Sequence, residues 1–232
     1  MERRRHHQFG RPAGSVFSAA ININNAGQVV GTSFVGVAQY AVEWSGGAVI
    51  NLGALPDAAG TVAQAINDSG QAVGVSVVHG RGYAVEWSDG SLITLEDLPG
   101  AVGSDAASID AAGVVVGESG DRAAEWSGGR VIALGGLPGS SFSYAESIND
   151  LGQVVGYSVV DGVAYATEWS GGDVINLGRM AGFTFSDAHG INNSGETVGG
   201  SNGSIVPESS TWAMMLMGFA GLGLAGFRLR ST

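Results

Sequence analysis

The stretch INDLGQVVGYSVVDGVAYATEWSGGDVINLG, residues 148–178, holds one copy each of two short motifs that alternate along the chain. The first reads Ile-Asn-x-x-Gly-x-x-Val-Gly, occurs five times and returns after 43, 43, 39 and 43 residues, with aspartate replacing asparagine in the third copy. The second is centred on Ala-x-Glu-Trp-Ser and occurs four times. Self-similarity at a period of roughly 20–50 residues is typical of solenoids and propellers. The first motif starts at Ile23, Ile66, Ile109, Ile148 and Ile191, and the tryptophans of the second are Trp44, Trp87, Trp126 and Trp169.

Each full repeat predicts four antiparallel strands. Runs such as 153–159 and 164–169 are rich in β-branched and aromatic residues and are bounded by turn residues. In Asn-x-x-Gly the asparagine side chain can bond the backbone two residues on, and the glycine can adopt a positive φ, so a tight hairpin is expected. Ser-Gly-Gly or Ser-Asp-Gly predicts a second hairpin after each tryptophan. The 39-residue spacing is explained by a shortened hairpin between Gly117 and Glu125, which are 8 positions apart where the other copies have 12.

The repeats predict an all-β, propeller-like array of about four and a half four-stranded antiparallel blades, followed by a C-terminal hydrophobic helix. Two strands for each of the five first motifs and each of the four second motifs give 18 strands, whereas a closed five-bladed ring needs 20. Within the tryptophan strand, Val42 and Trp44 should face a packed layer while Ala41 and Glu43 face the other way. The expected domains are a basic, disordered tail at 1–14, the repeat domain at 15–200, a linker at 201–206 and a sorting or transmembrane segment at 207–232.

The composition excludes several classes of protein. Of the 232 residues 40 are glycine, 44% are apolar and only 13% are charged, which is too apolar for a disordered acidic chain. The absence of cysteine excludes disulfides, thiolate zinc sites and cysteine nucleophiles. Residues 12–207 carry four arginines and 19 acidic residues, a net charge of −15. Because such a surface repels phosphate backbones, nucleic acid is not an expected partner.

Taken together, the two motifs resemble the probable extracellular repeat family called HAF repeats, over about residues 17–199. The resemblance rests on the Ile-Asn-x-x-Gly-x-Val-Val-Gly signature, the aromatic-tryptophan strand and the Leu-Gly-x-Leu turn. The His-Ala-Phe triplet that names the family is here Tyr-Ala-Val at Tyr40 and Tyr83, or Tyr-Ala-Thr at Tyr165. The family implies a surface or secreted location and no assigned catalytic residues.

The C-terminal sequence VPESSTWAMMLMGFAGLGLAGFRLRST differs from the repeats and resembles the PEP-CTERM sorting signal that exosortases recognise. The family's opening motif is Val-Pro-Glu-Pro, and here Ser209 stands at its last position. The resemblance implies an exosortase-type membrane enzyme as a processing partner. The expected sorting residues are Val206, Pro207, Glu208, Arg228 and Arg230.

The apolar run at 212–227 is expected to enter a membrane. Its 16 residues would span roughly 24 Å as a helix, less than the roughly 30 Å hydrocarbon core, and its four glycines weaken it further. Arg228 and Arg230 should stay cytoplasmic by the positive-inside rule, which places residues 1–211 outside the inner membrane. The N-terminal MERRRHHQFGRPAG is no signal peptide. We therefore expect an upstream extension with a signal peptide and at least two more strands, or else a non-classical export route.

Few residues are candidates for chemistry. His79 and His189 are isolated, His6 and His7 lie in the tail, and no metal-ligand spacing is present. The glutamates before each tryptophan could form a carboxylate ring, and the Asn/Asp series of the first motif could bind calcium, but strand packing and hairpin chemistry are the preferred interpretations. No catalytic residue, metal site or cofactor is predicted. These series are Glu43, Glu86, Glu125 and Glu168, and Asn24, Asn67, Asp110, Asn149 and Asn192.

The sequence therefore favours an exported, non-catalytic repeat protein that is sorted through the inner membrane to the cell surface or matrix. Its role is expected to be binding or structural, with exopolysaccharide as a candidate partner. One alternative is an extracellular propeller enzyme acting on polysaccharide, which should show a polar cluster in one blade only; no such cluster is evident in the sequence. Another is a tail-anchored membrane protein that keeps residues 212–227.

Overall fold

The computed structural model describes residue 10 and residues 12–202, and every regular element in that part of the chain is a β-strand. The eighteen strands predicted from the motifs are confirmed. We call the strands of successive repeats units 1 to 5. Unit 1 comprises β1 (Ser15–Ile23), β2 (Val29–Val35), β3 (Ala38–Ser45) and β4 (Ala48–Asn51); unit 2 comprises β5 (Ala58–Ile66), β6 (Ala72–Val78), β7 (Arg81–Ser88) and β8 (Ser91–Thr94). Unit 3 comprises β9 (Ser104–Ile109), β10 (Val115–Ser119), β11 (Arg122–Ser127) and β12 (Arg130–Gly135). Unit 4 comprises β13 (Ser140–Ile148), β14 (Val154–Val160), β15 (Val163–Ser170) and β16 (Asp173–Gly178), and unit 5 comprises β17 (Phe185–Ile191) and β18 (Thr197–Asn202).

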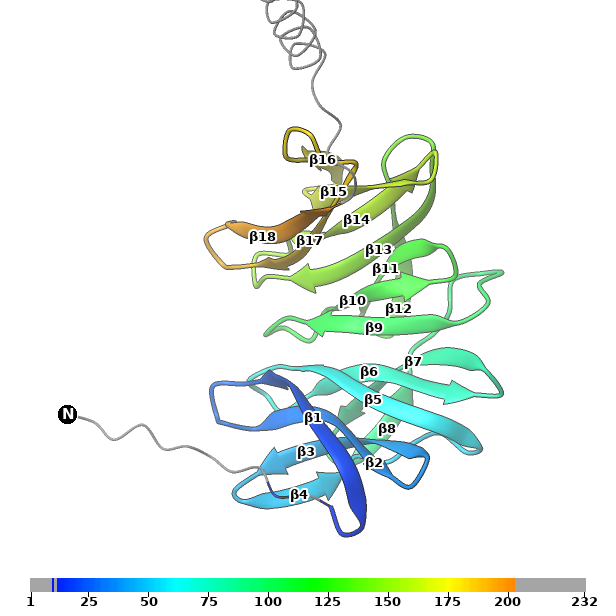
Figure 1. Cartoon of the computed structure of the whole chain (residues 1–232), viewed down its shortest axis with the longest axis vertical. Coiled ribbons are helices and arrows are strands. Elements are labelled where there is room, and N and C mark those ends of the chain that lie inside the picture. The colour runs from blue at the N-terminus through cyan, green and yellow to red at the C-terminus, as the bar shows by residue number, and fades with distance from the viewer. Residues whose placement is uncertain (1–9, 11, 203–232) are drawn as a thin grey trace, which may run out of the picture.

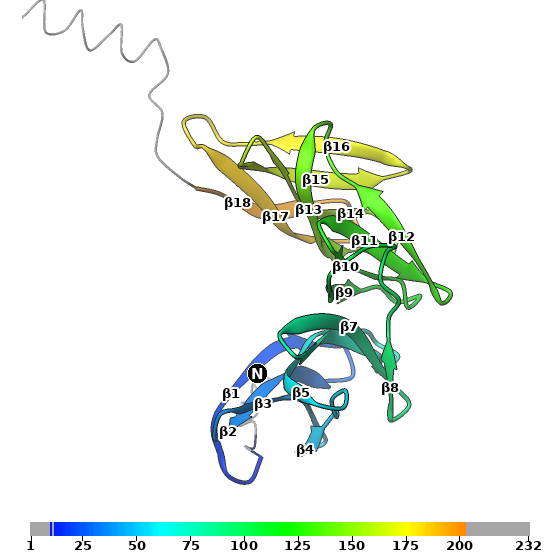
Figure 2. The same ribbon diagram turned by 90° about the vertical axis from the view of Figure 1, so that its right-hand side faces the viewer.

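The strands form small antiparallel sheets in chain order. Units 3 and 4 are separate four-stranded sheets and unit 5 is a two-stranded sheet. Units 1 and 2 count as one eight-stranded sheet only because β3 and β5 share a single parallel pair, Gln39 with Gly60. Units 1 to 4 follow one another along the longest axis, and unit 5 lies beside unit 4 (Figure 1). In the perpendicular view the units follow a curved path, with units 1 and 5 on the same side of it (Figure 2).

The hairpins form by the side-chain chemistry that the first motif predicts. In unit 2 the Asn67 side-chain oxygen accepts hydrogen bonds from the backbone N–H of Ser69 at 3.1 Å and of Gln71 at 3.0 Å, and Gly70 has a φ of 81°. The predicted short hairpin in unit 3 is confirmed as well. There β10 and β11 have 5 and 6 residues, whereas β6 and β7 have 7 and 8.

The second glycine of the first motif is required by a close backbone approach. A Cβ built on Gly74 would lie 2.0 Å from the carbonyl oxygen of Val62 on the neighbouring strand. The same clash, at 2.0–2.1 Å, recurs in every unit. Only glycine lets the first two strands of a unit pair at this point. The equivalent glycines are Gly31, Gly74, Gly117, Gly156 and Gly199.

The repeat tryptophans lie in the core, as predicted, each only 4–5% exposed. Each indole N–H also donates to a backbone carbonyl at the end of the preceding repeat, as Trp87 does to Gly53 at 3.3 Å and Trp169 to Gly135 at 3.3 Å. In unit 1 the acceptor is Gly10, at 2.7 Å from Trp44. The tryptophan therefore fixes each unit to the chain segment before it.

Both faces of the tryptophan strand are packed. Val42 and Trp44 are buried as expected, but Ala41 is fully buried too, because it packs with Ala63 of unit 2. Glu43 is likewise buried, so the possibility that this glutamate faces solvent is wrong for unit 1. Ala41 is covered because unit 2 stacks on unit 1, whereas Glu43 is held by Gln28 of its own hairpin. The equivalent glutamates of units 2 to 4 are only partly buried.

No helix among the described residues is long and apolar enough to cross a membrane. The predicted C-terminal helix and the sorting residues Val206, Pro207, Glu208, Arg228 and Arg230 lie outside the described residues.

Candidate functional site

The asparagines of the first motif join neighbouring units and do not converge on a metal. Their side-chain N–H groups donate to the backbone carbonyl of the next copy: Asn24 to Asn67 at 2.9 Å, and Asn149 to Asn192 at 2.9 Å. Asn67 bonds Asp110 in the same way at 3.1 Å. Within residue 10 and residues 12–202 no group of three or more histidine or carboxylate side chains could hold a metal ion.

The glutamates before the tryptophans are tied to their own hairpins. Gln28 donates to Glu43 at 2.9 Å, and Gln71 donates to Glu86 at the same distance. Unit 4 repeats the bond between Gln153 and Glu168 at 3.2 Å. These carboxylates therefore brace the strand against the hairpin turn.

Unit 3 departs from this pattern because Val114 replaces the glutamine and Asp110 replaces the asparagine. Burial, and secondly the negative charge of Asp110, raises the pKa of Glu125. The hairpin of unit 3 thus lacks the Asn-Gln-Glu chain of hydrogen bonds seen in units 1, 2 and 4.

Function is better sought where the repeats differ. In each unit, one position on the first strand lies directly opposite one position on the second strand in the antiparallel register. Residues opposite each other in this way have their side chains on one face of the sheet. In order from unit 1 to unit 5 the pairs are Ala19 with Thr32, Val62 with Val75, Asp105 with Glu118, Tyr144 with Tyr157, and Asp187 with Gly200.

These positions change character halfway along the array. Units 1 and 2 carry small or aliphatic side chains with one threonine, whereas units 3 to 5 carry carboxylates and tyrosines at every position except Gly200. A neighbouring first-strand position adds Glu146 in unit 4 and His189 in unit 5. We name this set the divergent face: Asp105, Glu118, Tyr144, Glu146, Tyr157, Asp187 and His189.

Two carboxyl groups of unit 3 lie opposite each other. Burial raises the pKa of Asp105 to about 6, against a hydrogen bond that Gln64 of unit 2 donates to it at 2.6 Å. Burial, and secondly the charges of Asp105 and Asp121, raises the pKa of Glu118 to about 7. Like charges placed across a strand pair repel each other. This pair therefore holds a proton close to neutral pH.

Aromatic rings lie beside these carboxyl groups. In unit 4 the rings of Tyr144 and Tyr157 are 6.0 Å apart, and Phe142 lies 5.9 Å from Tyr157. Burial, and secondly the charges of Asp105 and Glu118, raises the pKa of Tyr144, which places the unit 3 carboxyls near its hydroxyl. Both tyrosines thus keep their protons and present a ring together with a hydrogen-bonding hydroxyl.

His189 joins unit 5 to unit 4. Its Nδ1 atom lies 2.6 Å from a carboxylate oxygen of Glu146, and its Nε2 atom lies 3.4 Å from a carboxylate oxygen of Asp187. The hydrogen bond with Glu146 is the main cause that raises the pKa of His189 above its ordinary value. His189 is isolated in the sequence, but in the folded protein it contacts the carboxylates of Glu146 and Asp187. His79 lies in a turn with a φ of 50°.

The sequence shows no polar cluster confined to one unit, and the divergent face is of another kind because it extends over units 3, 4 and 5. The divergent face was missed because its residues lie between the two motifs and share no motif of their own. The signal that could have found them is the fourth residue before each Ile-Asn, together with the residue after each Val-Gly. Read along the five copies, the first of these positions gives Ala19, Val62, Asp105, Tyr144 and Asp187.

The sequence matches no protein-family model and no curated protein. Among solved structures it is similar to the crystal structure of TolB from Acinetobacter baumannii, at 16% sequence identity and a TM-score of 0.48. The similarity covers 67% of this chain and 40% of the TolB chain, so the chain spans less than half of that protein's length.

Proposed function

We propose that this chain is an exported binding protein that uses the divergent face to hold a polysaccharide. The repeats supply a propeller-like array of about four and a half blades, and the C-terminal signal supplies the route out of the cell. The observation that carries the proposal is the run of tyrosines and carboxylates on three consecutive units of an otherwise regular scaffold.

The chemistry of that face suits a sugar chain. Tyrosine rings can cover the apolar C–H face of a pyranose, while carboxylates and phenol hydroxyls bond its hydroxyl groups. Successive units present these groups side by side, as the contacts of Gln64 with Asp105 and of Glu146 with His189 show. A polymer with a repeating unit can follow such a row from one unit to the next.

Charge narrows the ligand class. Residues 12–207 have a net charge of −15, and the divergent face itself is rich in carboxylates. Such a surface repels a polymer of uronic acids. A neutral glucan or a polymer of amino sugars is therefore the expected ligand.

Co-sedimentation with three insoluble or gelled polymers tests the proposal: a neutral glucan, a glucosamine polymer and a uronate polymer. We expect binding to one of the first two. Tyr157→Ala changes no charge and should weaken that binding by at least about tenfold, the equivalent of 1.4 kcal/mol. Val75→Ala, at the same register position in unit 2, is the matched control. Equal binding by both variants, or none to any polymer, would contradict the proposal.

A second candidate function is hydrolysis of a polysaccharide, and the pair formed by Asp105 and Glu118 favours it. Glycosidases use one protonated carboxyl group as the acid and one carboxylate as the base or nucleophile. Glu118 would donate its proton to the leaving oxygen while Asp105 takes a proton from the attacking water. Release of reducing ends that is abolished by Glu118→Gln would establish hydrolysis; binding without release would leave the binding proposal alone.

For export we propose that an exosortase-type enzyme cuts near Val206, Pro207 and Glu208 and releases the repeat domain to the surface or matrix. The expected span of roughly 24 Å is too short for a stable anchor. Mature protein from a host with an exosortase should lack Trp212, and replacing both Arg228 and Arg230 by serine should impair processing. If mass spectrometry of the mature protein still finds residues 212–227, the tail-anchor alternative replaces sorting.

A further inference from the structure

One junction of the divergent face brings two acidic side chains beside two aromatic ones. Asp105 and Glu118 lie opposite each other in unit 3, and Tyr144 and Tyr157 lie opposite each other at the same register position in unit 4. Strands β9 and β10 of unit 3 lie next to β13 of unit 4, so the two pairs are neighbours. Burial, and then the charges of nearby carboxylates with Glu118 among them, raises the pKa of both phenols. We call these four residues the junction site.

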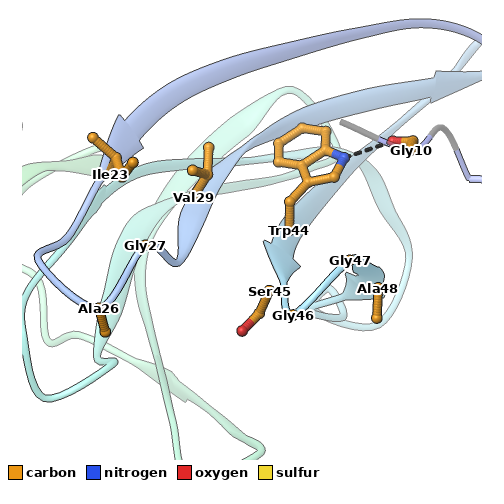
Figure 3. Close-up of a pocket in the computed structure, with 10 residues that line it drawn as sticks. All are labelled: Gly10, Ile23, Ala26, Gly27, Val29, Trp44, Ser45, Gly46, Gly47 and Ala48. Carbon is orange, nitrogen blue, oxygen red and sulfur yellow. Dashed lines mark hydrogen bonds between the residues drawn. The ribbon is translucent and has the colours of Figure 1, made fainter. Parts of the chain in front are cut away.

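The junction site can be reached by a ligand, because all four of its residues are only half-buried. The groove at unit 1 offers a different environment. Figure 3 shows Ile23 and Val29 beside the indole ring of Trp44, and none of the described residues that line this groove is charged. A charged group of a ligand therefore finds an opposite charge at the junction site and none in that groove.

Where units 4 and 5 meet, the fold supplies a cation of its own. His189 lies 2.6 Å from a carboxylate oxygen of Glu146 and 3.4 Å from one of Asp187. A protonated imidazole in this place offsets the repulsion between the two carboxylates. The raised pKa of His189, caused mainly by its hydrogen bond with Glu146, favours that protonated form.

Where units 3 and 4 meet, the fold supplies no such cation. Ala107 occupies in unit 3 the position that His189 has in unit 5. Within residue 10 and residues 12–202, no arginine or histidine forms an ion pair with Asp105 or Glu118. Asp105 accepts its hydrogen bond from the neutral amide of Gln64, at 2.6 Å. This acidic pair is therefore able to take a cation from outside the chain.

We propose that the junction site binds a protonated amino group, so that the ligand is a polymer of amino sugars with free amines; this inference rests on the proposed binding function. An ammonium group offsets the repulsion between Asp105 and Glu118, which a sugar hydroxyl cannot do. A third carboxylate, Asp121, acts on Glu118 as well and strengthens the attraction. The rings of Tyr144 and Tyr157 attract a cation over their faces, and their hydroxyls accept hydrogen bonds from its N–H groups.

Two soluble oligosaccharides of equal length test the inference: a hexamer of glucosamine, and the same hexamer with every amine acetylated. The backbone is the same in both, and only the first carries positive charges. Binding to the full-length chain in a mild non-ionic detergent is measured by isothermal titration calorimetry. The pH is mildly acidic to keep the amines protonated, and physiological ionic strength screens attraction between distant charges. We expect the free-amine hexamer to bind at least about tenfold more tightly than the acetylated one.

Variants separate the junction site from a general attraction to an acidic protein. Glu118→Gln and, in a second variant, Asp105→Asn each remove one carboxylate of the pair. Either change should bring the affinities for the two hexamers to within about twofold of each other. Asp89→Asn removes the same charge from an exposed turn of unit 2 and should leave the preference as it is in the parent.

The outcomes distinguish this inference from the proposed function. Equal affinity of the parent for the two hexamers, with Tyr157→Ala weakening both, would overturn the inference and leave polysaccharide binding intact. A preference that Asp89→Asn reduces as much as Glu118→Gln does would overturn it too, because the attraction would then be general. So would an absence of binding to either hexamer, and co-sedimentation with the neutral glucan would then decide whether the proposed function stands.

Discussion

Units 2 and 4 have the same skeleton of hydrogen bonds but different faces. In unit 2, Gln71 bonds Glu86 at 2.9 Å, and in unit 4, Gln153 bonds Glu168 at 3.2 Å. Yet the facing pair on the first two strands is Val62 with Val75 in unit 2 and Tyr144 with Tyr157 in unit 4. The motifs fix the backbone, and the residues between them are free to vary. Function is therefore expected where the units differ, because the residues that they share form the hairpins, the core and the contacts between units.

The largest expected effect is on the shared skeleton. Truncation of Trp87 to alanine should lower the free energy of unfolding by roughly 3–5 kcal/mol, because the indole is buried at the junction of two units. Urea denaturation measures the change. Trp126→Ala is the matched variant in unit 3 and should cost a similar amount, since its indole is equally buried. A Trp87→Ala protein as stable as the parent would contradict the packing.

The skeleton could be predicted from the sequence because the same chemistry is repeated. Asn67 and Gly70 specify their hairpin through a side-chain hydrogen bond and a positive φ, and neither depends on distant residues. The burial of Ala41 on the second face could not be predicted in this way. It depends on how one unit stacks on the next, which the strand pattern of a single unit does not contain.

A second effect on the skeleton should come from the motif glycine. Gly74→Ala would place a methyl group 2.0 Å from a backbone oxygen, so the first two strands of unit 2 must move apart. Strain of this kind costs roughly 1–3 kcal/mol. Thermal denaturation measures it, with Gly60→Ala as the control, because Gly60 also lacks a positive φ and a Cβ there would meet only the flexible side chain of Gln39, at 3.2 Å. Equal losses in both variants would show that the close approach has no cost of its own.

The divergent face could not be predicted from the sequence for a different reason. The first strands contain a register shift near its residues, for instance between Ala145 and Ser147, so alternation along the strand does not give the face of each side chain. Glu146 and His189 meet across two units and are 43 residues apart in the chain. Only the stacking of the units brings them together.

The carboxyl pair of unit 3 should make stability depend on pH. The pKa of Glu118 is raised in the folded protein to about 7 from 4.5, so the folded state holds more protons than the unfolded state between these values. Stability must then fall as the pH rises from about 4.5 to 7. We expect an effect smaller than that of the glycine, because Glu118 is half-buried and solvent screens its charge.

Urea denaturation at a series of pH values measures this slope. Glu118→Gln removes the titrating group and should flatten the fall, while leaving the stability near pH 4.5 close to that of the parent. Val75→Gln puts the same amide at the equivalent position of unit 2 and should leave the slope unchanged. An identical slope in the parent and in Glu118→Gln would show that ionisation of Glu118 does not lower the free energy of unfolding.

The smallest expected effect tests whether unit 3 has lost part of the skeleton. The Asp110 carboxylate still accepts hydrogen bonds from the backbone N–H of Ala112 at 2.9 Å and of Val114 at 2.8 Å. Unlike an asparagine, its side chain has no N–H group to donate to unit 4. The double variant Asp110→Asn with Val114→Gln would give unit 3 a hydrogen bond to the Asn149 carbonyl and one to Glu125. These are equivalent to the bonds that Asn24 and Gln28 make in unit 1. A net hydrogen bond contributes about 0.5–1.5 kcal/mol, so a gain of about that size is expected.

The two substitutions should depend on each other. A glutamine at position 114 alone loses the apolar contact that Val114 makes with the core of units 3 and 4, and finds no amide partner at Asp110. A double-mutant cycle in urea should therefore give a favourable coupling, since the glutamine oxygen accepts from the new asparagine while its N–H donates to Glu125. The reverse change in unit 2, Asn67→Asp with Gln71→Val, removes the same bonds and should destabilise. If the unit 3 double variant is no more stable than the parent, unit 3 is satisfied by other contacts and its hairpin is equivalent to the rest.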